Sequence, residues 1–171
     1  MEGMESQKVR VLGIDPGLNT TGYGVLLTEV NRLEIVEAGV IRSIRSQSLE
    51  QRLQSIYDGV IDVIKSFSPD VLAIEELYSH YERPTTAILM GHARGVLCLA
   101  AAQHGLPVCH YAATQIKRML TGNGRASKPQ VQLAVTRQLN LSTVPEPPDI
   151  ADALAIAMCH HFLSRNPASS L

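Results

Sequence analysis

The sequence predicts an α/β fold in which helices flank a mixed five-stranded sheet. Five segments have the short apolar or alternating pattern of strands, and five others have the 3.6-residue apolar spacing of helices. The first three strands follow one another through short connections, whereas helices separate the later strands. Short connections favour antiparallel neighbours, and helical connections favour parallel ones. The sheet is therefore expected to be antiparallel over its first three strands and parallel afterwards.

The N-terminal part of the chain is predicted to form three strands. Apolar residues dominate from Lys8 to Asp15, which indicates a central strand. Pro16-Gly17 then forms a turn signal, because proline presets φ and glycine accepts a positive φ. Two further strands are expected at residues 23–30 and 33–42, joined by a tight turn at Asn31-Arg32.

Helices dominate the rest of the chain. Ser48 and Gln51 form a capping-box pattern, and apolar residues then recur at helical spacing as far as Phe67. Val71–Glu75 is short and apolar, as is typical of a strand in a parallel sheet. The helix at 85–104 is apolar nearly all round and is expected to be buried on more than one side. The remaining elements are expected to be a strand at 108–111 and helices at 114–120, 127–139 and 149–163.

Length and composition indicate a single globular domain. The 171 residues are 45% hydrophobic and 18% charged, which excludes a disordered chain. We expect one domain over 1–171, with residues 1–7 and 165–171 as flexible tails. The longest apolar run is too short to cross a membrane, and the acidic N-terminus does not resemble a signal peptide. Three widely spaced cysteines indicate reduced, buried thiols, so a cytoplasmic location without membrane partners is expected.

Charge is distributed unevenly along the chain. Residues 1–82 carry 7 Lys/Arg and 13 Asp/Glu, a balance of −6, and residues 146–171 carry 1 and 3, a balance of −2. Residues 83–145 carry 7 Lys/Arg and no acid, so their balance is +7 and the total is −1. A stretch of this kind predicts a surface for phosphate groups.

Four carboxylates indicate the chemistry of the site. Asp15 and Glu75 end two predicted strands, at the sheet edge where open α/β sheets bind ligands. Asp149 and Asp152 are three residues apart, so they share one face of a helix. Clustered acids are costly unless a positive charge lies between them. Carboxylates are preferred ligands of Mg²⁺, and paired metal ions commonly cleave phosphodiesters. The pattern therefore predicts a metal-dependent nuclease.

Each acid also has an ordinary structural explanation when it is taken alone. Asp149 is a possible helix N-cap with Asp152 as its capping partner, Asp15 a possible turn residue, and Glu75 a possible strand-end charge. Their combination favours the metal site. Neighbouring Glu76 is expected to point to the opposite face of its strand, which makes Glu75 the better candidate.

The ordered set of motifs resembles the RuvC Holliday junction resolvases, which are crossover junction endodeoxyribonucleases. The matching segments are Gly13-Ile14-Asp15-Pro16-Gly17, Thr21-Gly22-Tyr23-Gly24, Ala73-Ile74-Glu75, Gly91-His92-Ala93-Arg94-Gly95 and Asp149-Ile150-Ala151-Asp152-Ala153-Leu154-Ala155. The resemblance implies a ribonuclease-H-like fold and a homodimer. It also implies paired, symmetric nicking of four-way DNA junctions in recombination and repair, in cooperation with the RuvA and RuvB branch-migration proteins.

The same resemblance implies roles for individual residues. The four acids Asp15, Glu75, Asp149 and Asp152 would hold two Mg²⁺ ions per active site, with Mn²⁺ as a substitute. Lys117 would be a further catalytic residue that neutralises charge developing on the phosphate. The products would carry 5′-phosphate and 3′-hydroxyl ends.

DNA contacts are expected from the acid-free stretch and from one aromatic residue. The basic candidates are Lys117, Arg118, Arg125 and Lys128, and Tyr78 corresponds to a family position whose ring stacks on a junction base. Arg94 is explained either by pairing with acids within the fold or by contact with DNA at a dimer interface. Gly122-Asn123-Gly124 is either a turn or a place where the backbone approaches DNA closely.

Three rival functions are considered. An actin-like or sugar-kinase-like ATPase begins with a similar strand and turn, but it needs a second domain that this length does not provide. A junction-binding protein without catalysis is disfavoured because all four acids are present. A related ribonuclease-H-like nuclease acting on RNA is the third alternative.

Overall fold

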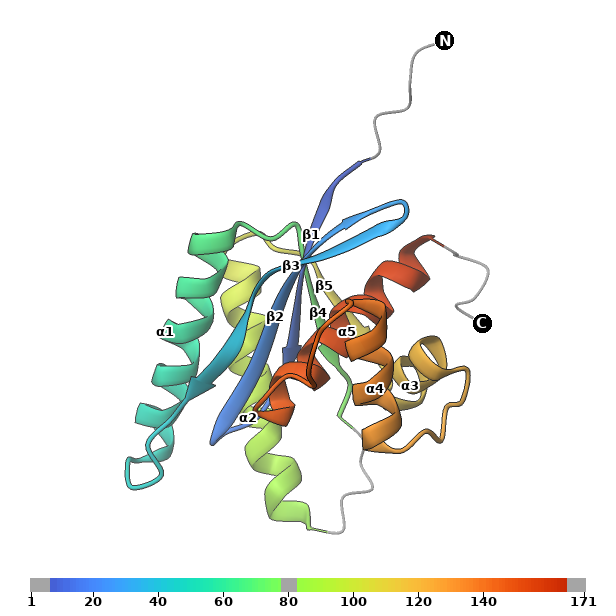
Figure 1. The fold of residues 1–171 in the computed structure, drawn as a ribbon. Helices are drawn as coiled ribbons and strands as arrows, with labels where there is room; N and C mark the ends of the chain where they lie inside the picture. The colour runs from blue at the N-terminus through green and yellow to red at the C-terminus, as the bar shows by residue number, and fades with distance from the viewer. Residues whose placement is uncertain (1–6, 78–82, 166–171) are drawn as a thin grey trace.

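A five-stranded sheet with the order β3-β2-β1-β4-β5 runs through the centre of the molecule (Figure 1). The computed structural model describes residues 7–77 and 83–165. Strands β1–β2 and β2–β3 pair antiparallel, whereas β1–β4 and β4–β5 pair parallel, which confirms the mixed sheet. The strands are β1 (Val9–Asp15), β2 (Thr20–Glu29), β3 (Arg32–Arg42), β4 (Val71–Glu75) and β5 (Val108–Tyr111).

Helices cover both faces of the sheet and make a three-layered domain (Figure 1). Alternate strand residues supply the two cores, so Leu12 packs toward one layer of helices and Val11 toward the other. Helices α1 (Leu49–Phe67) and α2 (Pro84–Gln103) form the first layer, and α3 (Ala113–Thr121), α4 (Lys128–Gln138) and α5 (Pro148–Arg165) form the second.

Element boundaries agree with the sequence predictions to within a few residues, with two small corrections. The β2–β3 turn occupies Val30-Asn31 and not Asn31-Arg32, because Arg32 already pairs with Glu29. Arg165 ends α5 and is not part of a tail. The rest of the expected C-terminal tail and residues 1–6 lie outside the described residues. Ser48 caps α1 as its sequence predicts, since its hydroxyl accepts from the Gln51 backbone N–H.

Helix α2 is only half covered by the rest of the chain, so the expectation of burial on more than one side was wrong for a single copy. Its inner side packs Ala93 and Leu97 against α1 and the sheet. Ile88 and Leu99 are 62% and 52% exposed on its outer side. Among the described residues, α2 alone is long and apolar enough to suit a membrane span by length and composition. Its inner side belongs to the domain core, as in many core helices of globular proteins.

Helix α5 lies unusually close to strands β1 and β2. A side-chain Cβ at Gly13 would lie 2.2 Å from the Ala153 carbonyl oxygen of α5. A Cβ at Gly22 would lie 2.1 Å from the Asp149 carbonyl oxygen. Both distances are shorter than any normal contact, so only glycine permits this approach. The two glycines therefore let the start of α5 rest directly on the sheet.

We predict that Gly22→Ala destabilises the fold and displaces the first turn of α5. The added methyl group collides with backbone, which cannot move as a flexible side chain does, and overpacking of this kind costs about 1–3 kcal/mol. Gly95→Ala is the matched control, because a Cβ at Gly95 of α2 has no atom within 4 Å. Thermal unfolding should show a lower Tm for Gly22→Ala alone, and equal Tm values would contradict the packing argument.

Candidate active site

Asp15 and Glu75 lie side by side at one edge of the sheet. They end the parallel neighbours β1 and β4, whose register pairs Ile14 with Ile74. Both isoleucines face the α1–α2 layer, so the carboxylates that follow them face the α5 layer. Neighbouring Glu76 is exposed and lies beyond the strand, which agrees with the preference for Glu75.

Helix α5 brings the other two acids to the same place. Asp15 pairs across the sheet with Gly22, and the Asp149 Cβ would be 2.9 Å from a Cβ at Gly22. Asp152 follows one helical turn later. Asp149 lies inside the first turn of α5, which begins at Pro148, so it is not the N-cap residue. The structure thus gathers the four predicted acids around the edge of β1 and β4.

Two lysines from the acid-free stretch reach this group of acids. The Lys128 ammonium nitrogen lies 2.8 Å from Asp152 Oδ2. Lys117 and Lys128 line a hollow of about 220 Å³ together with Glu75 and Asp152. Lys128 is well exposed, so this ion pair adds little to stability. It does place a positive charge beside the acids.

Burial, together with the crowding of negative charge, shifts the ionisation of the site. Burial raises the pKa of Asp15 to about 8, with further contributions from the charges of Asp152, Glu75 and Asp149. Burial and the Asp152 charge also raise the pKa of Glu75, and Lys117 opposes that shift. The hydrogen bond to Asp152 raises the pKa of Lys128. Without a cation, the centre therefore does not ionise fully near neutral pH.

The donor set fits a divalent metal in its chemistry. Four carboxylates supply the hard oxygen ligands that Mg²⁺ prefers, and a cation would relieve the repulsion that raises the Asp15 pKa. As the side chains stand, no three acidic, His or Cys groups within residues 7–77 and 83–165 form a closed metal cluster. Asp152 contacts Lys128 through Oδ2 in this arrangement, so a cation would compete with the ammonium group for that oxygen.

Arg94 holds the end of the strand that carries Glu75. Its Nε donates to the Glu75 carbonyl oxygen at 3.0 Å, and a terminal nitrogen contacts His110 Nδ1. One side chain of α2 therefore links the ends of β4 and β5. These contacts give Arg94 a structural role, but its partners are a backbone carbonyl and an imidazole and not the acids that the sequence suggested.

The remaining candidates for DNA contact lie around α3 and α4. Arg118 is exposed, and so is Arg125, whose backbone N–H donates to Asn123 Oδ1 at 2.9 Å. Gly122 ends α3 with φ of 77°, which supports the turn interpretation of the glycine segment. Tyr78 lies outside the described residues.

Sequence reasoning treated Lys117 as catalytic and Lys128 only as a DNA contact. The structure places Lys128 in direct contact with one of the four acids. The capping box at Ser127 puts Lys128 at the first position of α4, but its contact with Asp152 depends on how α4 packs against α5. Two histidines near the end of α5 are also placed by the structure. His160 Nδ1 lies 2.7 Å from the Tyr111 hydroxyl, and burial lowers the pKa of both His160 and His161.

Comparisons with known proteins agree on one family. Residues 11–160 match the family Crossover junction endodeoxyribonuclease RuvC. The RuvC of Rhodopirellula baltica is 59% identical over 157 residues, covering 92% of this chain and 88% of that protein. The RuvC of Thermotoga maritima is 46% identical, with coverages of 92% and 93%. The solved structure of T. thermophilus RuvC in complex with a Holliday junction substrate has a TM-score of 0.86 at 34% identity, covering 92% of this chain and 95% of that chain.

These matches confirm the family resemblance and the ribonuclease-H-like fold that the motifs implied.

The raised Asp15 pKa predicts how the stability of the metal-free protein depends on pH. Because the pKa of Asp15 is higher in the folded protein, its bound proton stabilises the folded state relative to the unfolded chain. This contribution is complete below the unfolded pKa of 3.8 and is lost as the pH rises toward 8. Asp15→Asn removes the effect. In EDTA, the free energy of unfolding of Asp15→Asn should therefore rise relative to that of the wild type between pH 5 and pH 8, by about 1.4 kcal/mol per pH unit at most. Denaturant unfolding at several pH values measures this, and a pH-independent difference would contradict it.

Proposed function

Because the chain belongs to the RuvC family of crossover junction endodeoxyribonucleases, we propose that the carboxylates at the β1, β4 and α5 ends form its catalytic centre. The protein is a metal-dependent endonuclease that resolves four-way (Holliday) DNA junctions in recombination and repair. One observation supports the assignment above all. Asp15 is partly buried beside three other acids at the sheet edge, where burial and their charges raise its pKa to about 8, and a bound cation would favour its ionised form.

The proposed cofactor is a pair of Mg²⁺ ions, for which Mn²⁺ can substitute. Asp15, Glu75, Asp149 and Asp152 would hold them through carboxylate oxygens. Once bound, the ions supply a water nucleophile at neutral pH and stabilise charge on the scissile phosphate and leaving oxygen. Hydrolysis would then leave 5′-phosphate and 3′-hydroxyl ends.

Lys117 and Lys128 complete the centre in this proposal. Both line the hollow beside Glu75 and Asp152, so a phosphate entering there meets two ammonium groups. Lys128 contacts Asp152 in this structure, and it would be free to face that phosphate where Asp152 holds a cation. A positive charge placed there stabilises the additional negative charge of the transition state.

The acid-free stretch is the proposed path of the DNA backbone. Arg118 and Arg125 lie on α3 and on the loop that follows it, beside the lysines of the centre. Contacts between basic side chains and backbone phosphates increase the affinity for DNA and make binding strongly dependent on salt, but they do not distinguish one base sequence from another. Tyr78 is proposed to stack on a junction base.

A homodimer would place two such centres on one junction, as paired symmetric nicks require. The outer side of α2, with Ile88 and Leu99 exposed, is the proposed contact between the two copies. The branch-migration proteins RuvA and RuvB are proposed partners. The proposed location is the cytoplasm.

The main test compares cleavage of a synthetic four-way junction with that of duplex DNA and RNA hairpins, in Mg²⁺ or EDTA. Junction nicking that requires the metal separates this function from binding without catalysis and from a nuclease acting on RNA. Asp15→Asn should reduce nicking below detection while junction binding survives, because the basic surface is untouched. Glu76→Gln is the control and should keep wild-type activity, since its side chain is exposed beyond β4. If Asp15→Asn still cuts, the site assignment is wrong.

The dimer has its own test. Replacing Ile88 and Leu99 together by Asp puts charge on the outer side of α2 without touching its buried residues. Light scattering should show a fall from twice the mass of the 18.6 kDa chain to a single mass. The control, Leu133→Asp, alters an apolar residue of α4 that is 45% exposed and should leave the mass unchanged. A wild-type monomer at micromolar concentration would contradict the proposed dimer.

A further inference from the structure

A second hollow borders the catalytic centre and was not expected from the sequence. It has a volume of about 490 Å³ and lies between the β1–β2 connection, the loop after β3 and the first turns of α1 and α2. Asp149 lines this hollow, whereas Asp152 lines the one that contains the two lysines. Its polar walls come from Asn19, Thr20, Arg45, Arg52 and Thr86.

The Arg52 guanidinium is held in a fixed place by neutral groups. Its Nε donates to Ser43 Oγ at 3.1 Å, and a terminal nitrogen donates to Asn19 Oδ1. The Ser43 backbone N–H in turn donates to the Asn19 carbonyl at 3.1 Å. The loop after β3 and the β1–β2 connection are thus tied together around a positive charge that they do not neutralise.

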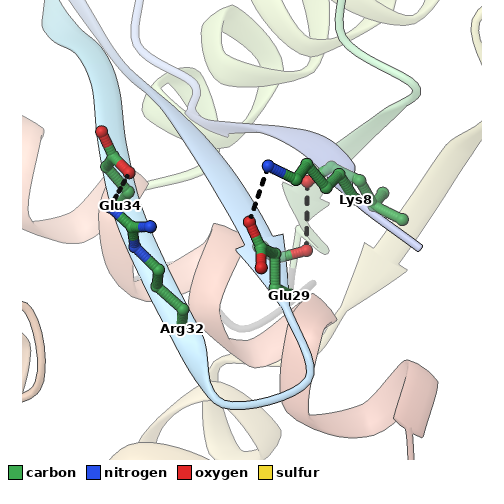
Figure 2. Close-up of polar contacts among 6 residues, drawn as sticks. Lys8, Glu29, Arg32 and Glu34 are labelled. Carbon is green, nitrogen blue, oxygen red and sulfur yellow. Dashed lines mark hydrogen bonds and ion pairs between the residues drawn. The ribbon is translucent and has the colours of Figure 1, made fainter. Parts of the chain in front are cut away.

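Basic residues at the opposite end of the sheet are arranged differently. There Lys8 lies 3.2 Å from Glu29, and Arg32 lies 2.8 Å from Glu34 (Figure 2). Within the part of the chain that the structure describes, neither Arg45 nor Arg52 has a carboxylate within 4.0 Å. Arg52 is partly buried among neutral hydrogen-bond acceptors and Arg45 is exposed beside it, so the hollow presents two positive charges suited to an anion from outside the chain.

We propose that Arg45 and Arg52 form a second binding subsite for the DNA backbone, on the Asp149 side of the catalytic centre. The proposal rests on the function proposed above. On one side of the acids, Lys117 and Lys128 would hold the strand that is cleaved. On the other side, Arg45 and Arg52 would hold another backbone phosphate of the same DNA arm. A planar guanidinium can bind a phosphate through two parallel hydrogen bonds. Both arginines lie within residues 1–82, whose net charge is −6, so the charge balance of the sequence does not indicate this subsite.

The test measures junction binding by Asp15→Asn protein in EDTA, at about 50 to 200 mM salt. The slope of log affinity against log salt is negative, and each lost phosphate contact should reduce its magnitude by about 0.9. Arg45→Gln and Arg52→Gln should each show that fall, and the double variant should show about twice as much. Arg52→Lys keeps the charge but not the planar fork, so its affinity should lie between wild type and Arg52→Gln.

Arg32→Gln is the matched control, because it removes the same charge at the far end of the sheet (Figure 2). The proposal is overturned if both single variants keep the parent slope, or if Arg32→Gln lowers it equally. Arg45 makes no side-chain hydrogen bond within residues 7–77 and 83–165, so Arg45→Gln remains informative even where Arg52→Gln unfolds. Wild-type cleavage in Mg²⁺ is measured in parallel, and its absence would count against the function itself.

Discussion

The direct contact between α5 and the β1–β2 pair is the constraint on which the rest of the structure depends. Asp15 is fixed by β1, but Asp149 and Asp152 reach it only because α5 rests on the sheet at Gly13 and Gly22. A helix normally packs at a distance set by the side chains beneath it. Here those side chains are absent, and backbone meets backbone. The same glycines that complete the core therefore also bring the acids together.

Bringing the acids together destabilises their ionised forms, and packing elsewhere in the domain offsets this. Hydrophobic packing of α5 holds the carboxylates in place even though burial and mutual repulsion raise the Asp15 pKa to about 8. Lys128 relieves part of that repulsion in the absence of metal, through its contact with Asp152. The centre is thus kept ready for a cation by the rest of the domain, as expected where function conflicts with local stability.

The two helical layers contribute differently to the site. The layer of α3, α4 and α5 carries the lysines and two of the acids, so it contains most of the catalytic chemistry. The layer of α1 and α2 supports the site from behind, since Arg94 of α2 holds the Glu75 carbonyl and Arg52 of α1 holds the β1–β2 connection. Helix α2 also exposes Ile88 and Leu99 on its outer side. A proposed dimer contact there would be joined to the catalytic edge through Arg94.

Local pattern alone determined the order of the elements, the mixed sheet and the positions of the four acids, at the ends of two strands and near the start of the last helix. Strand and helix periodicity, caps such as Ser48 and the three-residue spacing of Asp149 and Asp152 all depend on neighbours in sequence. Only the tertiary structure decided that Lys128 touches Asp152, that Arg94 holds Glu75, that Arg52 faces a hollow beside Asp149 and that α2 stays half uncovered. These features join residues from separate elements, and their distances depend on how closely the layers pack, which periodicity along one segment does not specify.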